Sequence, residues 1–352
     1  MAEALRISAA VDDRSLAVDL VVPEGGTTAL VGPNGAGKSS VLQLISGDLR
    51  PTAGRVVVHG KELSGAAEHV PPHRRRFGYV EQRALLFPHL DVVDNVAFGL
   101  RARGVARGAA RARAAEELAA VGCADLAERR PSALSGGQAQ RVSLARSLAT
   151  DPEVMLLDEP LAALDATVAP EIRALLRERL RGITTVLVTH DFLDVVALAD
   201  RVVELAAGRV LAEGPVDDLC QRPSTPFLAG FVGVNLLHGW AEGDGVVRLD
   251  PSTVFTGVAA DPLPDGPARA VFAPAAVSVF RDPPHGSPRN ELRAVVVAVE
   301  DRMPVQRVIL DVAGQRIAAD LTPAAVRDLG LASGQSVVAV IKATLVALHS
   351  SV

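Results

Sequence analysis

The stretch LVGPNGAGKSS, residues 30–40, constrains the fold of this chain more than any other, because it fits the pattern G-x-x-x-x-G-K-[ST] in full. Residues 28–31 form a short apolar run and helical spacing begins at Ser39, so the glycines are expected in a strand-to-helix turn. Backbone N–H groups of such a turn bind phosphate beside the positive end of the helix dipole. Lys38 adds a cation for the outer phosphates, and the Ser39 hydroxyl can bind a magnesium ion. The predicted phosphate cradle comprises Gly32, Pro33, Asn34, Gly35, Ala36, Gly37, Lys38, Ser39 and Ser40.

Composition favours a folded chain of two domains without a nucleic-acid partner. The 352 residues are 49% hydrophobic, which is enough for sizeable cores. The net charge of −5 gives no bulk attraction to nucleic acid. One arginine-rich run, residues 101–113, alternates with alanine and continues into glutamates, as a solvated helix does. We therefore expect no nucleic-acid partner.

The sequence also predicts a protein that is soluble or at most peripheral to a membrane. The first residues lack a basic segment followed by an apolar core, and the uncharged stretch at residues 223–241 contains Pro, Ser, Thr, Asn and His, so it lacks the continuous apolar character of a spanning helix. The two cysteines, Cys123 and Cys220, do not have the paired spacing of a metal site. Free thiols in a reducing cytosol are the expected state.

Strands and helices alternate through the first two thirds of the chain, which predicts an α/β domain. Residues 5–22 alternate loosely between apolar and polar and turn at residues 12–14, as an antiparallel hairpin does. Helical spacing over residues 91–148 predicts a helical insertion at about 84–148. A parallel sheet is expected from the short apolar strands at residues 28–31, 55–59, 77–82, 153–159 and 184–190.

Polar side chains stand at the ends of three of these strands. Gln82 ends one strand, Asp158 and Glu159 end another, and His190 ends a third. Ligands of open α/β sheets gather at the carboxyl ends of the strands, so these side chains are candidates for one site. The alternatives are that the carboxylates are merely solvated and that His190 caps a helix.

The composition of the chain changes near residue 219, where we place the start of a linker. Residues 220–226 have the proline and polar content typical of a linker, so the first domain is expected at 1–232 and the second at 235–352. Short valine-rich runs split by Gly, Pro and Asp predict a small β domain. Residues 271–279 and 340–348 also resemble each other, which is either a true internal repeat or chance.

A second motif, LSGGQAQR at residues 134–141, stands between the phosphate loop and the MLLDE run at 155–159. That order of motifs resembles the ATP-binding-cassette (ABC) ATPases, whose signature is L-S-G-G-Q. The resemblance runs from Gly32 to His190. Gln82, Asp165 and His190 fall where that family has its Q-loop, D-loop and H-loop. The implied fold is an α/β P-loop ATPase domain with a mixed sheet and a helical insertion.

The resemblance implies that two copies of the chain sandwich two ATP molecules head to tail. Each site would pair Lys38 of one chain with the signature of the other, made by Ser135, Gly136, Gly137 and Gln138, and with Asp165 nearby. Asp158 would hold magnesium together with Ser39 and Gln82. Glu159 would polarise the attacking water, and His190 would steady the γ-phosphate.

One position departs from the family pattern. Cassette ATPases commonly stack adenine on an aromatic residue a couple of dozen residues before the phosphate loop, and residues 12–15 contain no aromatic residue. Either adenine binds weakly or a different residue stacks on it.

The tail resembles the molybdate-binding-type, OB-like β domain found on molybdate-importer ATPases, with residues 287–352 the best-matched part. The resemblance rests on S-x-R-N (Ser287, Arg289, Asn290) and I-K-A-T (Lys342, Ala343, Thr344). A tetrahedral dianion is bound by hydroxyls, backbone N–H groups and cations, which these residues can supply. The alternative is that Lys342 is solvated and the domain serves only to form dimers.

Together the resemblances imply the ATP-hydrolysing subunit of an ABC importer for molybdate or tungstate, with ATP and Mg²⁺ as cofactors. The implied partners are a second copy of the chain, an integral membrane permease and, indirectly, a solute-binding protein, at the cytoplasmic face of the cell membrane. Importers of sulfate, iron or sugar remain alternatives, because their ATPases carry similar β tails. A non-transport cassette ATPase would usually carry two cassettes or a long coiled-coil insertion.

Overall fold

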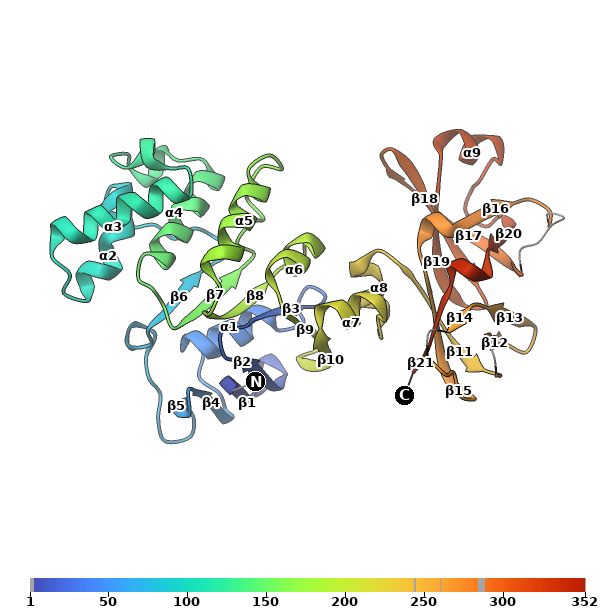
Figure 1. The fold of residues 1–352 in the computed structure, drawn as a ribbon, viewed down its shortest axis with the longest axis horizontal. Coiled ribbons are helices and arrows are strands. Elements are labelled where there is room, and N and C mark those ends of the chain that lie inside the picture. The colour runs from blue at the N-terminus through green and yellow to red at the C-terminus, as the bar shows by residue number, and fades with distance from the viewer. Residues whose placement is uncertain (1–2, 244, 260, 284–288, 352) are drawn as a thin grey trace. The chain divides into compact units, whose positions relative to one another are not determined.

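The computed structural model describes residues 3–243, 245–259, 261–283 and 289–351, which form two compact units, Met1–Val216 and Asp217–Val352 (Figure 1). Two short helices, α7 (Val216–Gln221) and α8 (Pro226–Val232), fall almost entirely in the second unit. The boundary between the two compact units lies between Val216 and Asp217, at the start of these helices. The domain boundary at 232–235 remains a prediction. No helix of the described residues is long and apolar enough to cross a membrane.

The first unit is built around a six-stranded sheet with the strand order β10-β9-β3-β8-β7-β6 (Figure 1). All its pairs are parallel except β10–β9, which confirms the predicted parallel arrangement and adds one antiparallel edge. The prediction was wrong for residues 55–59, which pair antiparallel in a separate sheet. Every residue of β3, β7 and β8 is buried, as expected for strands covered on both faces. The strands are β3 (Thr27–Val31), β6 (Phe77–Val80), β7 (Val154–Asp158), β8 (Thr184–Val188), β9 (Arg201–Ala206) and β10 (Arg209–Pro215).

A second, four-stranded antiparallel sheet contains the predicted N-terminal hairpin. Its order is β2-β1-β4-β5, and the turn between β1 and β2 is a 3₁₀ helix, η1 (Asp12–Arg14), as expected. Side chains of this sheet share one core with the phosphate-loop strand and the helix after it. The strands are β1 (Glu3–Val11), β2 (Leu16–Pro23), β4 (Ala53–Val58) and β5 (Lys61–Ser64).

Three of the helices of the first unit, α2, α3 and α4, fall within the predicted insertion and pack on one another (Figure 1). Asp91 caps α2 by accepting a hydrogen bond from the Asp94 backbone N–H at 2.7 Å. The α-helices are α1 (Lys38–Ser46), α2 (Val92–Ala102), α3 (Arg107–Ala120), α4 (Gly136–Leu148), α5 (Ala169–Arg179) and α6 (Phe192–Leu198); the short 3₁₀ helices are η2 (Pro72–Arg74), η3 (Ala124–Leu126) and η4 (Pro131–Ala133).

The second unit is the predicted small β domain, and each valine-rich run lies in a strand. Its sheets have the orders β13-β12-β11-β15-β21-β14 and β16-β20-β17-β18-β19, and they share one hydrophobic core. The elements are β11 (Asn235–Ala241), β12 (Val246–Asp250), β13 (Thr253–Thr256), β14 (Val258–Ala259), β15 (Gly266–Phe272), η5 (Pro274–Ala276), β16 (Val277–Phe280), β17 (Asn290–Arg302), β18 (Val305–Val312), β19 (Gln315–Leu321), α9 (Pro323–Asp328), β20 (Ser336–Ile341), η6 (Ala343–Leu345) and β21 (Ala347–Ser350).

The internal resemblance in the tail is confirmed as a structural repeat. Both copies form a strand, a 3₁₀ turn and a second strand: β15-η5-β16 and β20-η6-β21. The copies exchange partners, because β15 pairs with β21 and β16 pairs with β20. Asn235 and Asn290 begin the matching strands β11 and β17, and each bonds the backbone of a distant residue through both ends of its amide. The two halves are therefore interlocked.

Candidate functional site

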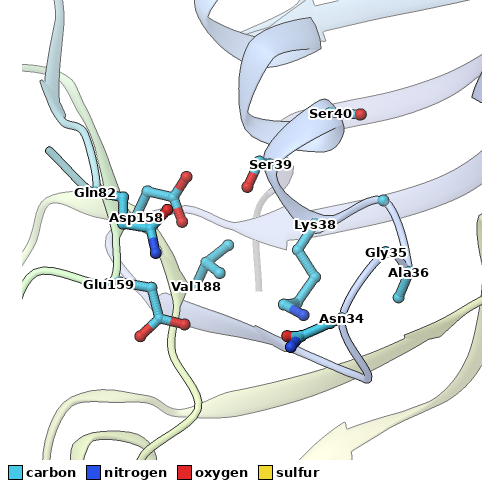
Figure 2. A pocket seen from close by; sticks show the side chains of 11 residues that line it. Asn34, Gly35, Ala36, Lys38, Ser39, Ser40, Gln82, Asp158, Glu159 and Val188 are labelled. Atoms are coloured by element: carbon cyan, nitrogen blue, oxygen red, sulfur yellow. The ribbon is translucent and has the colours of Figure 1, made fainter. Parts of the chain in front are cut away.

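A cavity of about 280 Å³ lies at the N-terminus of α1, where the phosphate cradle was predicted (Figure 2). The phosphate loop forms one wall and the carboxyl ends of the neighbouring strands form the other. Gln82, Asp158 and Glu159, which were predicted from their positions at strand ends, face Lys38 across the cavity (Figure 2). The lining residues are Asn34, Gly35, Ala36, Gly37, Lys38, Ser39, Ser40, Gln82, Asp158, Glu159 and Val188.

The loop adopts its path because two of its glycines have no side chain. Gly37 has φ 103°, and a Cβ there would lie 2.8 Å from the Leu16 Cδ1 of the N-terminal hairpin. Gly32 has φ 147°, and its Cβ would lie 2.1 Å from the Leu205 carbonyl oxygen. A larger residue at either position would push the loop away from its neighbours, so the glycines set the position of the cradle.

The far end of α1 is held by a buried arginine. Arg75 is 5% exposed and donates to the carbonyl oxygens of Leu44 and Ile45, which belong to the last turn of α1. It also donates to the Ser64 hydroxyl at 2.5 Å. Burial lowers the pKa of Arg75 to about 10, so the group stays charged at neutral pH. A cation at the negative end of the helix dipole stabilises the helix that carries the cradle.

Lys38 points along the loop toward the space where phosphates would lie. Its Nζ donates to the Gly32 carbonyl oxygen at 2.7 Å and to the Pro33 carbonyl oxygen at 3.0 Å. Burial lowers the pKa of Lys38, while Glu159 and Asp158 raise it. A bound polyphosphate would add negative charge beside the ammonium group and so favour its charged form.

Asp158 is buried at the end of β7 and bonds the Ser39 hydroxyl. Burial raises the pKa of the Asp158 carboxyl, and the Ser39 hydroxyl and Lys38 lower it. The Asp158 carboxyl, the Ser39 hydroxyl and the Gln82 amide oxygen form an all-oxygen donor set, which is the kind that Mg²⁺ prefers. Among the described residues no cluster of three His, Cys, Asp or Glu side chains could hold a metal alone. The donors therefore fit a magnesium ion that is carried mainly by phosphate oxygens and water.

Glu159 and His190 are in direct contact, which the sequence did not predict. The His190 Nδ1 lies 2.5 Å from the Glu159 Oε2. Glu159 has φ 51°, a strained conformation for this residue type, and its N–H donates to the Val188 carbonyl oxygen at 2.9 Å. Burial raises the pKa of the Glu159 carboxyl and His190 lowers it. The carboxylate is thus aimed at the cavity and positioned by the neighbouring strand end.

A buried network holds the backbone on either side of His190. The Arg173 guanidinium on α5 donates to Asp194 Oδ1 through Nε at 2.8 Å and Nη2 at 2.6 Å. The Thr189 hydroxyl donates to Asp194 Oδ2 at 3.0 Å and accepts from the Asp191 N–H at 3.0 Å. Asp194 is 3% exposed, and burial raises the pKa of its carboxyl. Sequence reasoning missed this network, for which the polar residues flanking His190 were the only signal.

The signature residues do not line this chain's own cavity. Ser135 and Gln138 form a capping box at the start of α4: the Gln138 N–H donates to Ser135 Oγ at 3.3 Å, and the Ser135 N–H donates to Gln138 Oε1 at 2.9 Å. A Cβ on Gly137 would lie 3.0 Å from the Ala163 carbonyl oxygen, two residues before Asp165, whereas a Cβ on Gly136 would meet no atom within 4 Å. The structure therefore brings the signature beside the Asp165 loop.

In the second unit, Asn290 on β17 is in register with Ile341 on β20, so Arg289 and Lys342 are the next residues beyond the last pair of this ladder. Lys342 and Thr344 are exposed and Ala343 is partly exposed at η6. Asn290 is buried, and its amide bonds the N–H and carbonyl of Thr256 at 2.6 and 2.8 Å. Its side chain is thus occupied by the backbone. Ser287 lies outside the described residues.

Two family models match the chain: "ABC transporter" over residues 16–162 and "TOBE domain" over residues 286–348. The Molybdenum import ATP-binding protein ModC of Mycobacterium tuberculosis is 44% identical, over 98% of this chain and 97% of that protein. The Molybdate/tungstate import ATP-binding protein WtpC of Pyrococcus horikoshii is 34% identical over 92% of each. The Sulfate/thiosulfate import ATP-binding protein CysA of Mycobacterium bovis is 46% identical over 63% of each.

Solved structures agree for the first unit. A dimeric, post-hydrolysis state of the ATP-binding cassette MJ0796 bound to ADP and Pi matches with a TM-score of 0.54 and 33% identity, covering 57% of this chain and 90% of that one. CbiO1 of Clostridium perfringens, part of an ABC transporter complex, matches with a TM-score of 0.56 and 29% identity, covering 63% and 92%. With its phosphate loop, its acidic strand end and its β tail, this chain belongs to the ABC transporter family, as an ATP-binding subunit of the import type.

Proposed function

We propose that the chain hydrolyses ATP with magnesium and thereby energises import of molybdate or tungstate through a membrane permease. One observation supports the ATPase assignment above all: Asp158 and Glu159 face Lys38 across the cavity (Figure 2). The solute assignment rests on the relatives: the molybdenum importer subunit matches 98% of this chain, whereas the sulfate importer subunit matches 63%.

In the proposed reaction the oxygen of a water attacks the γ-phosphorus, and the bond from that phosphorus to the β–γ bridging oxygen breaks. Glu159 accepts hydrogen bonds from this water and takes up its proton, and His190, bonded to Glu159, holds the carboxylate in place. Lys38 leaves its carbonyl partners to bind the outer phosphates. A magnesium ion between Ser39, Asp158 and the phosphates would neutralise the charge that develops on the leaving group.

We propose that the complete site forms between two copies of the chain. The signature residues lie away from this chain's own cavity, yet Ser135 caps a helix whose N-terminus suits a phosphate. The solved cassette with ADP and Pi is dimeric, which supports the same arrangement. Ser135 and Gly137 of one copy then complete the cradle formed by Lys38 of the other, with Asp165 at the contact.

A groove of about 540 Å³ beside Gln82 fits docking of the permease at the cytoplasmic face of the membrane. Leu85 is 61% exposed and Phe98 is 44% exposed at this groove. Phe87 also lines the groove, with its ring 4.4 Å from that of Phe98 and 5.6 Å from the Arg146 guanidinium. Exposed apolar side chains of this kind suit an apolar helix of a partner. Glu81 and Leu85, on either side of Gln82 in the chain, both line the groove, so docking and the cavity are connected through one loop.

We further propose that the second unit binds molybdate or tungstate and slows transport when the oxyanion is plentiful. Support comes from the pairing of Asn290 with Ile341, which puts Arg289 and Lys342 at the same end of the β17–β20 ladder, because two cations and nearby backbone N–H groups suit a dianion. Occupancy inhibits only if one dimer state binds the anion better than the other. The alternative is a tail that only dimerises.

The test of the proposed function is uptake of radiolabelled molybdate into vesicles that contain the permease co-purified with this chain. We expect uptake that requires ATP and is competed by tungstate but not by sulfate. Equal competition by sulfate assigns the transporter to sulfate instead. Calorimetry of the full chain with molybdate tests the tail, where absence of heat leaves it a dimerisation module.

A further inference from the structure

Arg14, at the tip of the N-terminal hairpin, reaches across to the helix of the phosphate cradle. Its Nη1 donates to Ser40 Oγ at 3.0 Å and to Gln43 Oε1 at 2.6 Å. Ser40 lines the cavity, and Gln43 lies about one turn further along α1. Arg14 is exposed. An exposed guanidinium therefore lies at the rim of the cavity without itself forming its wall.

The hairpin tip is fixed in this position by close packing. Ser15 has φ 49°, and a Cβ on Gly208 would lie 2.1 Å from the Ser15 carbonyl oxygen. The Gly208 carbonyl accepts from the Ala17 N–H at 2.8 Å. On the other side, Leu16 packs where a Cβ of Gly37 would stand. Arg14 is thus presented to the rim of the cavity by a rigid turn.

The directions of Ser39 and Ser40 indicate which end of a bound nucleotide would lie near Arg14. Hydrolysis places the γ-phosphate near Glu159. Figure 2 shows Ser39 directed toward Asp158 and Ser40 directed to the opposite side of α1. The phosphate chain therefore runs from the acidic wall past Lys38 toward Ser40, and the nucleoside leaves the cavity on the side of Ser40 and Arg14.

The cavity cannot also hold the base. Its volume of about 280 Å³ is below the roughly 300–1,000 Å³ of pockets that enclose a drug-sized ligand. Its lining has no aromatic side chain among the described residues. The base must lie on the surface outside, and a planar guanidinium is a group that stacks on flat aromatic rings.

We propose that Arg14 is the base-binding residue of this site, with its guanidinium against the face of the purine ring of the bound nucleotide. The proposal rests on nucleotide binding at the cavity and adds the residue that holds the base. On binding, the guanidinium stays near Ser40 and Gln43, which keep its plane oriented. Stacking, rather than net charge, is the source of the affinity.

The experiment measures binding of ATP and of inorganic tripolyphosphate to the full chain by calorimetry, with magnesium present. Arg14→Ala is expected to weaken ATP about 3- to 30-fold, or about 0.7 to 2 kcal/mol at 1.4 kcal/mol per tenfold, and to change tripolyphosphate by less than about twofold. Arg14→Lys, which keeps the charge, should behave like Arg14→Ala. Arg14→Trp, which keeps a flat ring, should bind ATP at least as tightly as the unchanged chain.

The control is Arg74→Ala, which removes an exposed arginine from η2 and should leave both affinities unchanged. Three results overturn the proposal: ATP affinity unaffected by Arg14→Ala, equal losses for ATP and tripolyphosphate, or full affinity in Arg14→Lys. The last two make Arg14 a phosphate-binding cation. If the unchanged chain binds neither ligand, the proposed nucleotide site itself is wrong. That result differs from all three above, so failure of the nucleotide site can be told apart from failure of the role proposed for Arg14.

Discussion

Replacing Arg173 by alanine should destabilise the first unit and disturb the site at the same time. Asp194 is 3% exposed and takes two charge-assisted bonds from Arg173, so the substitution leaves a buried carboxylate with only the Thr189 hydroxyl. Breaking a buried pair by removing one partner costs about 3–5 kcal/mol. Because the Arg173 side chain is 15% exposed, water can partly replace it, and we take the lower end, about 3 kcal/mol.

Thermal unfolding measures this loss. At roughly 2–4 °C per kcal/mol for a unit of this size, the melting temperature of Arg173→Ala should fall by about 6–12 °C. The matched control is Arg177→Ala, one turn further along α5 and exposed, which should shift it by less than about 2 °C. Since Thr189 and Asp191 flank His190, turnover in Arg173→Ala should fall more than ATP affinity does. Equal melting temperatures for the two variants would refute the reasoning.

Three further predictions concern other parts of the molecule. Mixing inactive Lys38→Ala chains with inactive Ser135→Arg chains should restore part of the ATPase activity through one intact composite site; mixed dimers that stay inactive would count against sites shared between chains. Burial raises the pKa of Glu159 from the ordinary value of 4.5, and hydrolysis needs the ionised form, so kcat/KM should fall with decreasing pH along a limb above 4.5, whereas a limb at or below 4.5 contradicts this assignment. Asn290→Ala should cost about 1–3 kcal/mol in urea unfolding by removing the partner of the half-buried Thr256 backbone groups, and a cost under about 0.5 kcal/mol would exclude that role.

Local patterns in the sequence could predict which residues line the cavity, and the reason is physical. The phosphate cradle is a continuous stretch of chain, and Gln82, Asp158 and Glu159 each end a strand whose neighbours carry the other residues. Parallel strands bring their carboxyl ends to one edge, so the residues come together once the strands are recognised. Glu159 and His190 follow two neighbouring strands, β7 and β8. Their contact could have been predicted had the order of the strands in the sheet been known.

Features that depend on pairing between distant segments were not predictable in this way. Arg173 and Asp194 belong to different helices, and nothing in either helix alone specifies their contact. Asn290 was predicted as an oxyanion donor from its motif, but its amide is taken up by Thr256, 34 residues away. The exchange of β16 and β21 between the two halves of the tail also depends on register that a repeat in the sequence does not specify.

The central claim is that Glu159 positions the water that hydrolyses ATP in this cavity. The most direct measurement compares ATP binding and magnesium-dependent turnover of the unchanged chain and of Glu159→Gln, which keeps the shape of the side chain. The account predicts that the variant binds ATP normally and loses turnover by a factor on the order of a hundred or more. Turnover equal to that of the unchanged chain would contradict the account and remove Glu159 from the mechanism.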